Sequence, residues 1–114
     1  MAKTNNLEKQ IKAGRITPDM SFNEKVWALT SRIPAGRVTT YGDLAHKLHT
    51  RAYRAVGNAL NRNPFAPAVP CHRVVGGTGE LTGYAGGLLA KRRMLESEGV
   101  CLINGRVDLS RHRV

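Results

Sequence analysis

Acidic residues, aromatic residues and long apolar runs are all scarce in this 114-residue sequence. Only 8 Asp and Glu stand against 18 Lys and Arg, and the net charge of +10 indicates a polyanionic partner, with nucleic acid the first candidate. No apolar run approaches the roughly 20 residues of a bilayer span, and no apolar stretch follows the N-terminal charges as it does in a secretory signal. We therefore expect an intracellular protein without a membrane segment.

Cysteine is also rare. The two cysteines, Cys71 and Cys101, are too few for a disulfide framework. His46, His49 and His112 show no ligand spacing with a cysteine or a carboxylate. The sequence therefore predicts free thiols and no metal site.

The chain is long enough for one modest core. Residues 1–20 are polar and broken by Gly14 and Pro18, so we expect either a tail or a short, weakly docked helix there. A single domain is expected over residues 21–114.

Helix signals begin at Ser21, which forms a capping box with Glu24. Apolar residues then recur at helical spacing in several segments. Helices are expected over about 22–33, 41–48, 51–62 and 88–98, with Thr40 and Thr50 capping the second and third. Asn104-Gly105 predicts a β-hairpin between residues 100–103 and 106–109, because both turn residues tolerate a positive φ. The expected fold is mainly α with a small β-hairpin, a winged helix-turn-helix-like single domain.

The third predicted helix has two distinct faces at 100° per residue. One face carries Ala52, Val56, Ala59 and Leu60, and the opposite face carries Arg51, Arg54, Asn58 and Arg62. Small residues, Ala55 and Gly57, occupy the rest, so a partner could approach the backbone closely. No acidic residue occurs from Leu44 to Gly79, a stretch that also contains Lys47 and Arg73. This pattern is typical of the basic second helix of a helix-turn-helix.

Cys71 is the candidate nucleophile. It follows Pro70 and precedes His72 and Arg73, and a neighbouring histidine or cation favours the thiolate, the reactive form. The alternative is that Cys71 is a small buried apolar residue, as most free cysteines are.

The wider sequence favours the first interpretation. Pro70-Cys71-His72-Arg73-Val74 resembles the active-site signature of the O6-alkylguanine-DNA alkyltransferases, which transfer an alkyl group onto their own cysteine. Further segments resemble the family in the same order: Val38-Thr39-Thr40-Tyr41-Gly42, Arg54-Ala55-Val56-Gly57, Asn63-Pro64, Gly83-Tyr84-Ala85-Gly86-Gly87-Leu88 and Leu95-Glu96-Ser97-Glu98-Gly99. The resemblance implies DNA repair by a single irreversible transfer, without a cofactor, by a monomer that binds double-stranded DNA containing O6-alkylguanine.

The resemblance also implies roles at the catalytic centre. Cys71 corresponds to the alkyl acceptor. His72, acting through a water, and Glu98 correspond to the relay that draws away the thiol proton. Asn63 corresponds to the asparagine that braces the active-site turn, and Tyr41 to the tyrosine that hydrogen-bonds the target base. Without the family pattern, Tyr41 is equally a core aromatic and Glu98 a charged residue in a last helical turn.

Roles in substrate and DNA binding follow in the same way. Pro70, Val74, Tyr84 and Ala85 correspond to the walls and lid of the alkyl pocket. Arg54 resembles the arginine that fills the gap left by the rotated nucleotide, although it could be a solvated cation. The small residues Ala52, Ala55 and Gly57 would let the helix enter the minor groove. The polar residues that would contact the DNA are Arg51, Asn58, Arg62 and Arg73.

Two alternatives stay open. Alkyltransferase-like proteins are similarly short and bind O6-alkylguanine without repairing it, but they replace the acceptor cysteine that Cys71 supplies here. A general winged-helix regulator would leave Cys71, His72 and Glu98 without a purpose. Most alkyltransferases carry an additional N-terminal domain that the segment 1–20 is too short to form.

Overall fold

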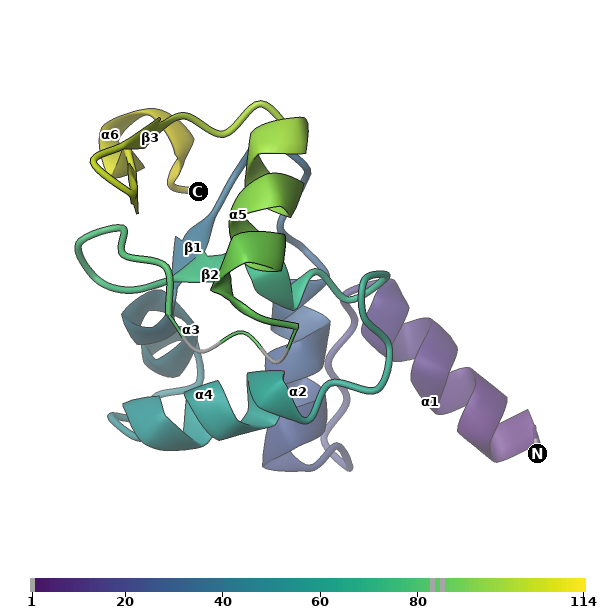
Figure 1. The fold of residues 1–114 in the computed structure, drawn as a ribbon. Coiled ribbons are helices and arrows are strands. Elements are labelled where there is room, and N and C mark those ends of the chain that lie inside the picture. The colour runs from purple at the N-terminus through teal and green to yellow at the C-terminus, as the bar shows by residue number, and fades with distance from the viewer. Residues whose placement is uncertain (1, 83, 85) are drawn as a thin grey trace.

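Helices make up most of the computed structural model, which describes residues 2–82, 84 and 86–114 (Figure 1). The described helices are α1 (Ala2–Lys12), α2 (Phe22–Thr30), α3 (Tyr41–Lys47), α4 (Tyr53–Asn61), α5 (Leu88–Ser97) and α6 (Leu109–His112). The strands are β1 (Thr39–Thr40), β2 (Val74–Val75), β3 (Leu102–Ile103) and β4 (Arg106–Val107). The predicted fold class is confirmed. None of the described helices is long and apolar enough to cross a membrane.

Side-chain caps set the starts of α2 and α3, as predicted. The Ser21 hydroxyl accepts from the Glu24 N–H at 3.2 Å, and the Glu24 carboxylate accepts from the Ser21 N–H at 2.8 Å. The Thr40 hydroxyl accepts from the Asp43 N–H at 3.0 Å. These bonds fix where the chain enters the helix-turn-helix formed by α3 and α4.

The start of α4 differs from the prediction. The helix begins at Tyr53, and the Thr50 hydroxyl accepts from the N–H of Ala52, ahead of the helix. The Tyr53 N–H donates to the Arg51 carbonyl at 2.8 Å, so the chain makes a tight turn before the helical bonds begin. Ala52 is therefore exposed rather than part of the apolar face, which Val56, Ala59 and Leu60 form.

Two strand pairs complete the domain. The Asn104-Gly105 turn joins β3 to β4, and both residues have the expected positive φ of 54° and 77°. The paired strands are shorter than predicted, and β4 ends at Val107 because Asp108 already caps α6. The parallel pairing of β1 with β2 was not predicted; it places Thr39 opposite Val74 and so brings the start of α3 beside the segment that follows Cys71.

The N-terminal segment is a docked helix. Ile11 is completely buried in a small core with Met20, Ala28 and Val69. The Arg32 guanidinium donates to the Gly14 carbonyl at 2.8 Å and ties the end of the segment to α2. The N-terminal turns of α1 project beyond the body of the molecule (Figure 1).

Candidate functional site

Cys71 lies in a short 3-10 turn, Cys71–Arg73, that leads directly into β2. Cys71 is 8 % exposed and belongs to the hydrophobic core beneath α4. Tyr41 and Tyr84 pack against the same core. The thiol is therefore at the meeting point of the helix-turn-helix, the strand pair and the segment before α5.

Asn63 braces the chain that delivers Cys71. Its side-chain amide donates to the Val69 carbonyl at 2.8 Å, and its side-chain oxygen accepts from the Phe65 N–H at 2.9 Å. The Cys71 N–H in turn donates to the Val69 carbonyl at 2.9 Å. One asparagine thus fixes both ends of the loop between α4 and the cysteine.

His72 is paired with Glu98, as the sequence predicts. The imidazole Nε2 lies 3.0 Å from a carboxylate oxygen of Glu98, and His72 is 2 % exposed. An ionised carboxylate only accepts hydrogen bonds, so Nε2 carries the proton in this pair. The other ring nitrogen, Nδ1, is buried and has no hydrogen-bond partner in the described part of the chain. Nδ1 is therefore the atom that can accept a proton.

Burial, the largest effect, lowers the pKa of His72 even though the hydrogen bond to Glu98 acts to raise it. The imidazole is consequently neutral at pH 7 and able to act as a base. For Glu98, burial acts to raise the pKa, but hydrogen bonds from Arg73 and His72 outweigh it and hold the pKa below its usual range. The pair is thus a neutral base oriented by a carboxylate.

Arg73 takes a different place from the predicted one. Its guanidinium donates to both carboxylate oxygens of Glu98, at 2.6 and 3.0 Å, and to the Ile33 carbonyl at 2.7 Å. These bonds hold Arg73 half-buried beside the relay, away from the exposed cations of α4. They also compensate the negative charge of Glu98 at the C-terminal end of α5, where the helix dipole disfavours it.

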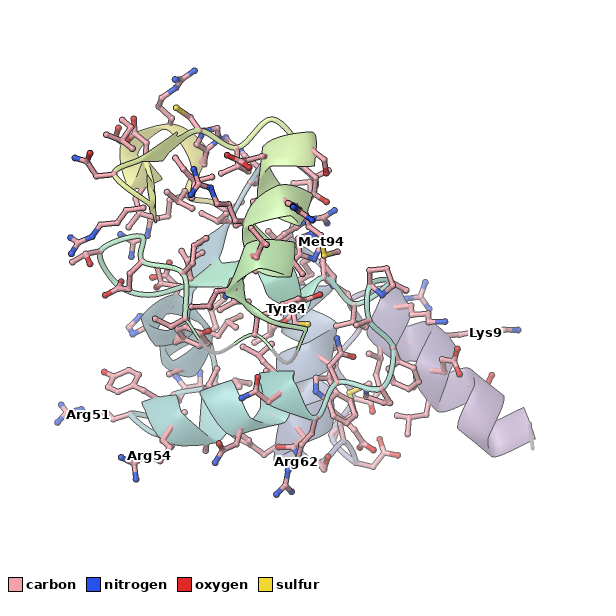
Figure 2. The ribbon with its side chains drawn as sticks, in the orientation of Figure 1. Lys9, Arg51, Arg54, Arg62, Tyr84 and Met94 are labelled. Atoms are coloured by element: carbon pink, nitrogen blue, oxygen red, sulfur yellow. The ribbon has the colours of Figure 1, made fainter. Side chains whose placement is uncertain are left out.

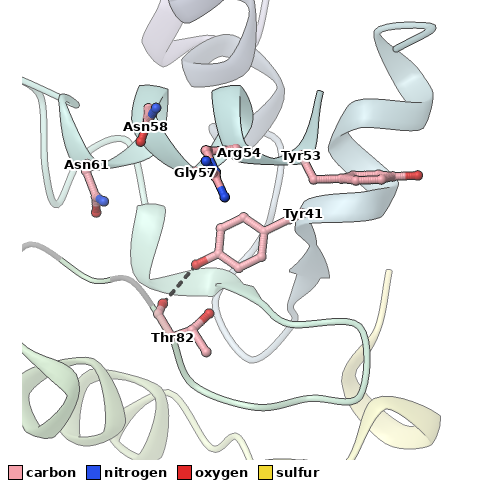
Figure 3. Close-up of a pocket in the computed structure, with 7 residues that line it drawn as sticks. All are labelled: Tyr41, Tyr53, Arg54, Gly57, Asn58, Asn61 and Thr82. Atoms are coloured by element: carbon pink, nitrogen blue, oxygen red, sulfur yellow. Dashed lines mark hydrogen bonds between the residues drawn. The ribbon is translucent and has the colours of Figure 1, made fainter. Parts of the chain in front are cut away.

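A hollow of about 360 Å³ opens between α4 and the segment before α5 (Figure 3). Its lining includes Tyr41, Tyr53, Arg54, Gly57, Asn58, Asn61 and Thr82. The Tyr41 hydroxyl donates to the Thr82 carbonyl at 2.8 Å. Burial raises the pKa of Tyr41, so the phenol keeps its proton. Cys71 is not among these lining residues; Tyr41 connects the two regions, because it packs against the core that holds Cys71.

The remaining predicted residues fall in three places. Arg51, Arg54 and Arg62 are exposed and point away from the body along α4 (Figure 2). Pro70 and Val74 are buried beside Cys71, and the Tyr84 hydroxyl donates to the Met94 sulfur at 3.4 Å. Ala85 lies outside the described residues.

Lys91 was not singled out from the sequence, yet it is 1 % exposed. Its Nζ donates to the Val74 carbonyl at 2.6 Å and to the Thr82 carbonyl at 2.9 Å, and lies 5.8 Å from the centre of the Tyr41 ring. Burial lowers the pKa of Lys91 to about 8, while an electrostatic interaction with Cys71 acts to raise it. The signal available in the sequence is helical phase: Lys91 precedes the buried Leu95 by four residues.

In the described ranges no group of three or more His, Cys, Asp or Glu is arranged to hold a metal ion. The site therefore contains a thiol, a neutral base with its carboxylate, a buried ammonium and a phenol. These groups are suited to nucleophilic transfer onto sulfur.

Comparisons with known proteins bear on this arrangement. Residues 21–100 match the family model described as "6-O-methylguanine DNA methyltransferase, DNA binding domain". The methylated-DNA–protein-cysteine methyltransferase of Methanosarcina acetivorans is 51% identical over 81 residues, which are 70% of this chain and 52% of the relative. The protein of the same name from Salmonella typhimurium is 48% identical over 83 residues, 72% of this chain and 48% of the relative. The chain thus spans about half the length of these curated relatives.

Two solved structures are also similar to this chain. Mycobacterium tuberculosis OGT in complex with DNA has a TM-score of 0.67 and 38% identity, covering 85% of this chain and 66% of that one. S. pombe Atl1, solved in complex with damaged DNA containing O6-carboxymethylguanine, has a TM-score of 0.72 and 28% identity, covering 82% of this chain and 94% of that one.

Proposed function

The chain belongs to the family of the 6-O-methylguanine DNA methyltransferase DNA-binding domain, and we propose that it repairs O6-alkylguanine in DNA by taking the alkyl group onto Cys71. The observation that supports this most directly is the His72–Glu98 hydrogen bond next to Cys71. The buried Nδ1 of His72 has no hydrogen-bond partner among the described residues and can accept a proton. Such an activity requires access to DNA, so we expect the protein to act inside the cell.

The proposed reaction begins at the thiol. Its proton passes to Nδ1 of His72, directly or through a water, and Glu98 stabilises the imidazolium that forms. The sulfur attacks the alkyl carbon, so that an S–C bond forms as the C–O6 bond breaks. The electron pair of the broken bond stays on the guanine, which takes up one proton. The products are a thioether on Cys71 and unmodified guanine, and the protein is used once.

Tyr41 and Lys91 support the same step. The Tyr41 hydroxyl, which donates to Thr82, can turn to the base and stabilise the charge that develops as guanine leaves. The Lys91 ammonium, which the Val74 and Thr82 carbonyls hold in place, would stabilise negative charge that develops on the sulfur during transfer. Lys91 reaches neither the alkyl group nor the base in this scheme and is assigned a positioning and electrostatic role.

A stacked base keeps its O6-alkyl group out of reach of a buried thiol, so the proposal requires the nucleotide to rotate out of the duplex. The basic face of α4 would hold the phosphates, and the hollow beside Tyr41 would receive the base. Arg54 lines that hollow and is exposed, which suits a side chain that enters the stack in place of the base.

The direct test is the mass of the protein after incubation with a duplex that contains O6-methylguanine. Transfer should add roughly 14 Da, one CH2, to the peptide that contains Cys71. The Cys71→Ser variant should stay unmodified, and Cys101 should carry no added mass in the wild-type protein. An unchanged wild-type mass after prolonged incubation would contradict the proposal.

Replacing Arg54 with alanine should slow repair in a duplex more than reaction with free O6-alkylguanine base. We expect a loss of about tenfold or more in the duplex, since extrusion of a nucleotide costs a few kcal/mol, and almost none with the free base. Arg93→Ala is the matched control, because it removes an exposed cation from α5, away from the basic face of α4. Equal slowing on both substrates would remove the assigned role of Arg54.

A second candidate function is recognition of the lesion without repair. It is favoured by the similarity to S. pombe Atl1, of whose chain 94% is covered. Cys71 with its His72–Glu98 pair favours transfer instead, since recognition alone needs no proton relay. Tight binding of the lesion with no mass added to Cys71 would support this second function.

A further inference from the structure

The turn that joins α3 to α4 carries a second hollow, which the proposed transfer does not use. Its volume is about 310 Å³, and its lining includes His46, His49, Thr50 and Arg51. His46, His49 and Arg51 are exposed and Thr50 is half-buried. The hollow is therefore open to a large partner.

Backbone hydrogen bonds fix the shape of this turn. The His49 N–H donates to the His46 carbonyl at 3.0 Å, and the Thr50 N–H donates to the Ala45 carbonyl at 3.0 Å. The Thr50 hydroxyl accepts from the N–H of Ala52 at 3.1 Å. Because these bonds hold the turn in place, the side chains that line the hollow start from fixed positions.

The lining residues suit an anion. Arg51 supplies a permanent guanidinium, Thr50 a hydroxyl, and the two imidazoles become cations when they gain a proton. Among the described residues that line it there is neither a carboxylate nor a thiolate, and the charge of Arg51 would repel a metal ion held by the imidazoles. A phosphodiester group, which is singly charged and presents several acceptor oxygens, matches these donors.

The hollow lies on the side of the molecule that carries the cations of α4. Arg51 and Arg54 project from the same end of that helix (Figure 2). A duplex that reaches Arg54 would therefore pass beside His46 and His49. We infer that this hollow binds a backbone phosphate of the DNA and that protonation of His46 and His49 strengthens duplex binding as the pH falls. The inference rests on the proposed function and extends it to a residue-specific contact.

The charged groups around the two histidines support this sign. Lys47 on α3 and Arg51 and Arg54 at the start of α4 are cations, so the region has a positive potential that a phosphate would neutralise. Asp43 is the acidic residue of α3, and the Arg113 guanidinium already holds its carboxylate at 2.7 and 3.0 Å.

The test is the affinity of the whole chain for an unmodified DNA duplex, measured by fluorescence anisotropy from pH 8.0 to 5.5 at constant ionic strength. We expect the wild-type affinity to rise by about five- to tenfold over this range, in which imidazoles gain their protons. The double variant His46→Gln, His49→Asn should show a nearly flat profile. Asparagine is chosen at position 49 because it tolerates the left-handed backbone (φ 56°) found there.

Arg106→Gln provides the control for charge, since it removes a cation from the β3–β4 hairpin and should keep the rise in affinity. A double variant that folds and keeps the wild-type pH profile would overturn the inference, as would a flat wild-type profile. Methylation of Cys71 is measured on the same samples to separate the two proposals. If Cys71 is methylated while binding shows no pH dependence, only the phosphate contact fails; if the wild-type protein neither binds DNA nor is methylated, both fail.

Discussion

Replacing Lys91 with methionine is expected to slow alkyl transfer to Cys71 by about 10²-fold at pH 7, the loss typical of removing one preorganised charge or donor from a water-excluded site. The Nζ is held between the carbonyls of Val74 and Thr82, so its charge cannot move away when the thiol ionises. Single-turnover kinetics with an O6-methylguanine duplex measure the loss. Methionine has a similar length, so the main change is the removal of the ammonium group.

The wild-type protein offers an independent test of the same role. Because the pKa of Lys91 is about 8, the ammonium loses its proton above this pH and the transfer rate should fall there. Stability should move in the opposite direction. Since the pKa of Lys91 in the folded state lies below the usual value of about 10.5, the unfolded chain binds more protons between pH 8 and 10.5, and the free energy of unfolding rises with pH in this window.

The matched control is Arg93→Met, which removes one positive charge from an exposed position on the same helix. It should leave the rate and its pH dependence unchanged. A Lys91→Met variant that reacts at the wild-type rate would disprove the role. If that variant fails to fold, the wild-type profile decides: a rate that stays constant from pH 7 to 9.5 is incompatible with a charged Lys91 in the reaction.

Local signals explain why much of the fold was predictable. The capping box of Ser21 with Glu24 and the Asn104-Gly105 turn depend on neighbours within three residues, and the structure contains both. The helix was predicted to begin at Arg51, because Thr50 was expected to cap it. The Thr50 hydroxyl instead accepts from the N–H of Ala52, which precedes the first helical residue, Tyr53. The parallel pairing of β1 with β2 joins segments 35 positions apart, and no local pattern specifies it.

The candidate site shows the same division between features that a local motif predicts and contacts that only the fold creates. Cys71, His72 and Glu98 came from a motif and from the order of motifs along the chain, and the structure brings His72 and Glu98 into hydrogen-bond contact. The contacts of Arg73 and Lys91 could not be predicted from the sequence, because their partners are carbonyl and carboxylate groups 9 to 40 residues away. From the sequence alone, such residues are expected to be solvated cations at the surface. Only the fold shows that Arg73 is half-buried and Lys91 is buried.

Replacing Glu98 with glutamine is expected to reduce the rate of transfer by about 10³-fold, within the range attributed to a positioned acid–base group. The carboxylate does two things that an amide cannot. It accepts a hydrogen bond from the Nε2–H of His72 at 3.0 Å, which leaves Nδ1 as the base. Its charge also stabilises the imidazolium that forms. A glutamine can keep the hydrogen bond through its oxygen, but it loses the charge, so the imidazolium is left uncompensated.

The same substitution separates chemistry from folding when it is compared with Glu96→Gln. Glu96 lies two residues earlier on α5, is exposed and contacts Arg92 at 3.4 Å, so its replacement changes the net charge equally without touching the relay. Glu98→Gln should also lower the stability, because the half-buried Arg73 loses its ionic partner. Rates are therefore compared at a temperature where circular dichroism shows both variants folded. Under those conditions, equal rates for the two variants would show that Glu98 holds Arg73 in place and takes no part in moving the thiol proton.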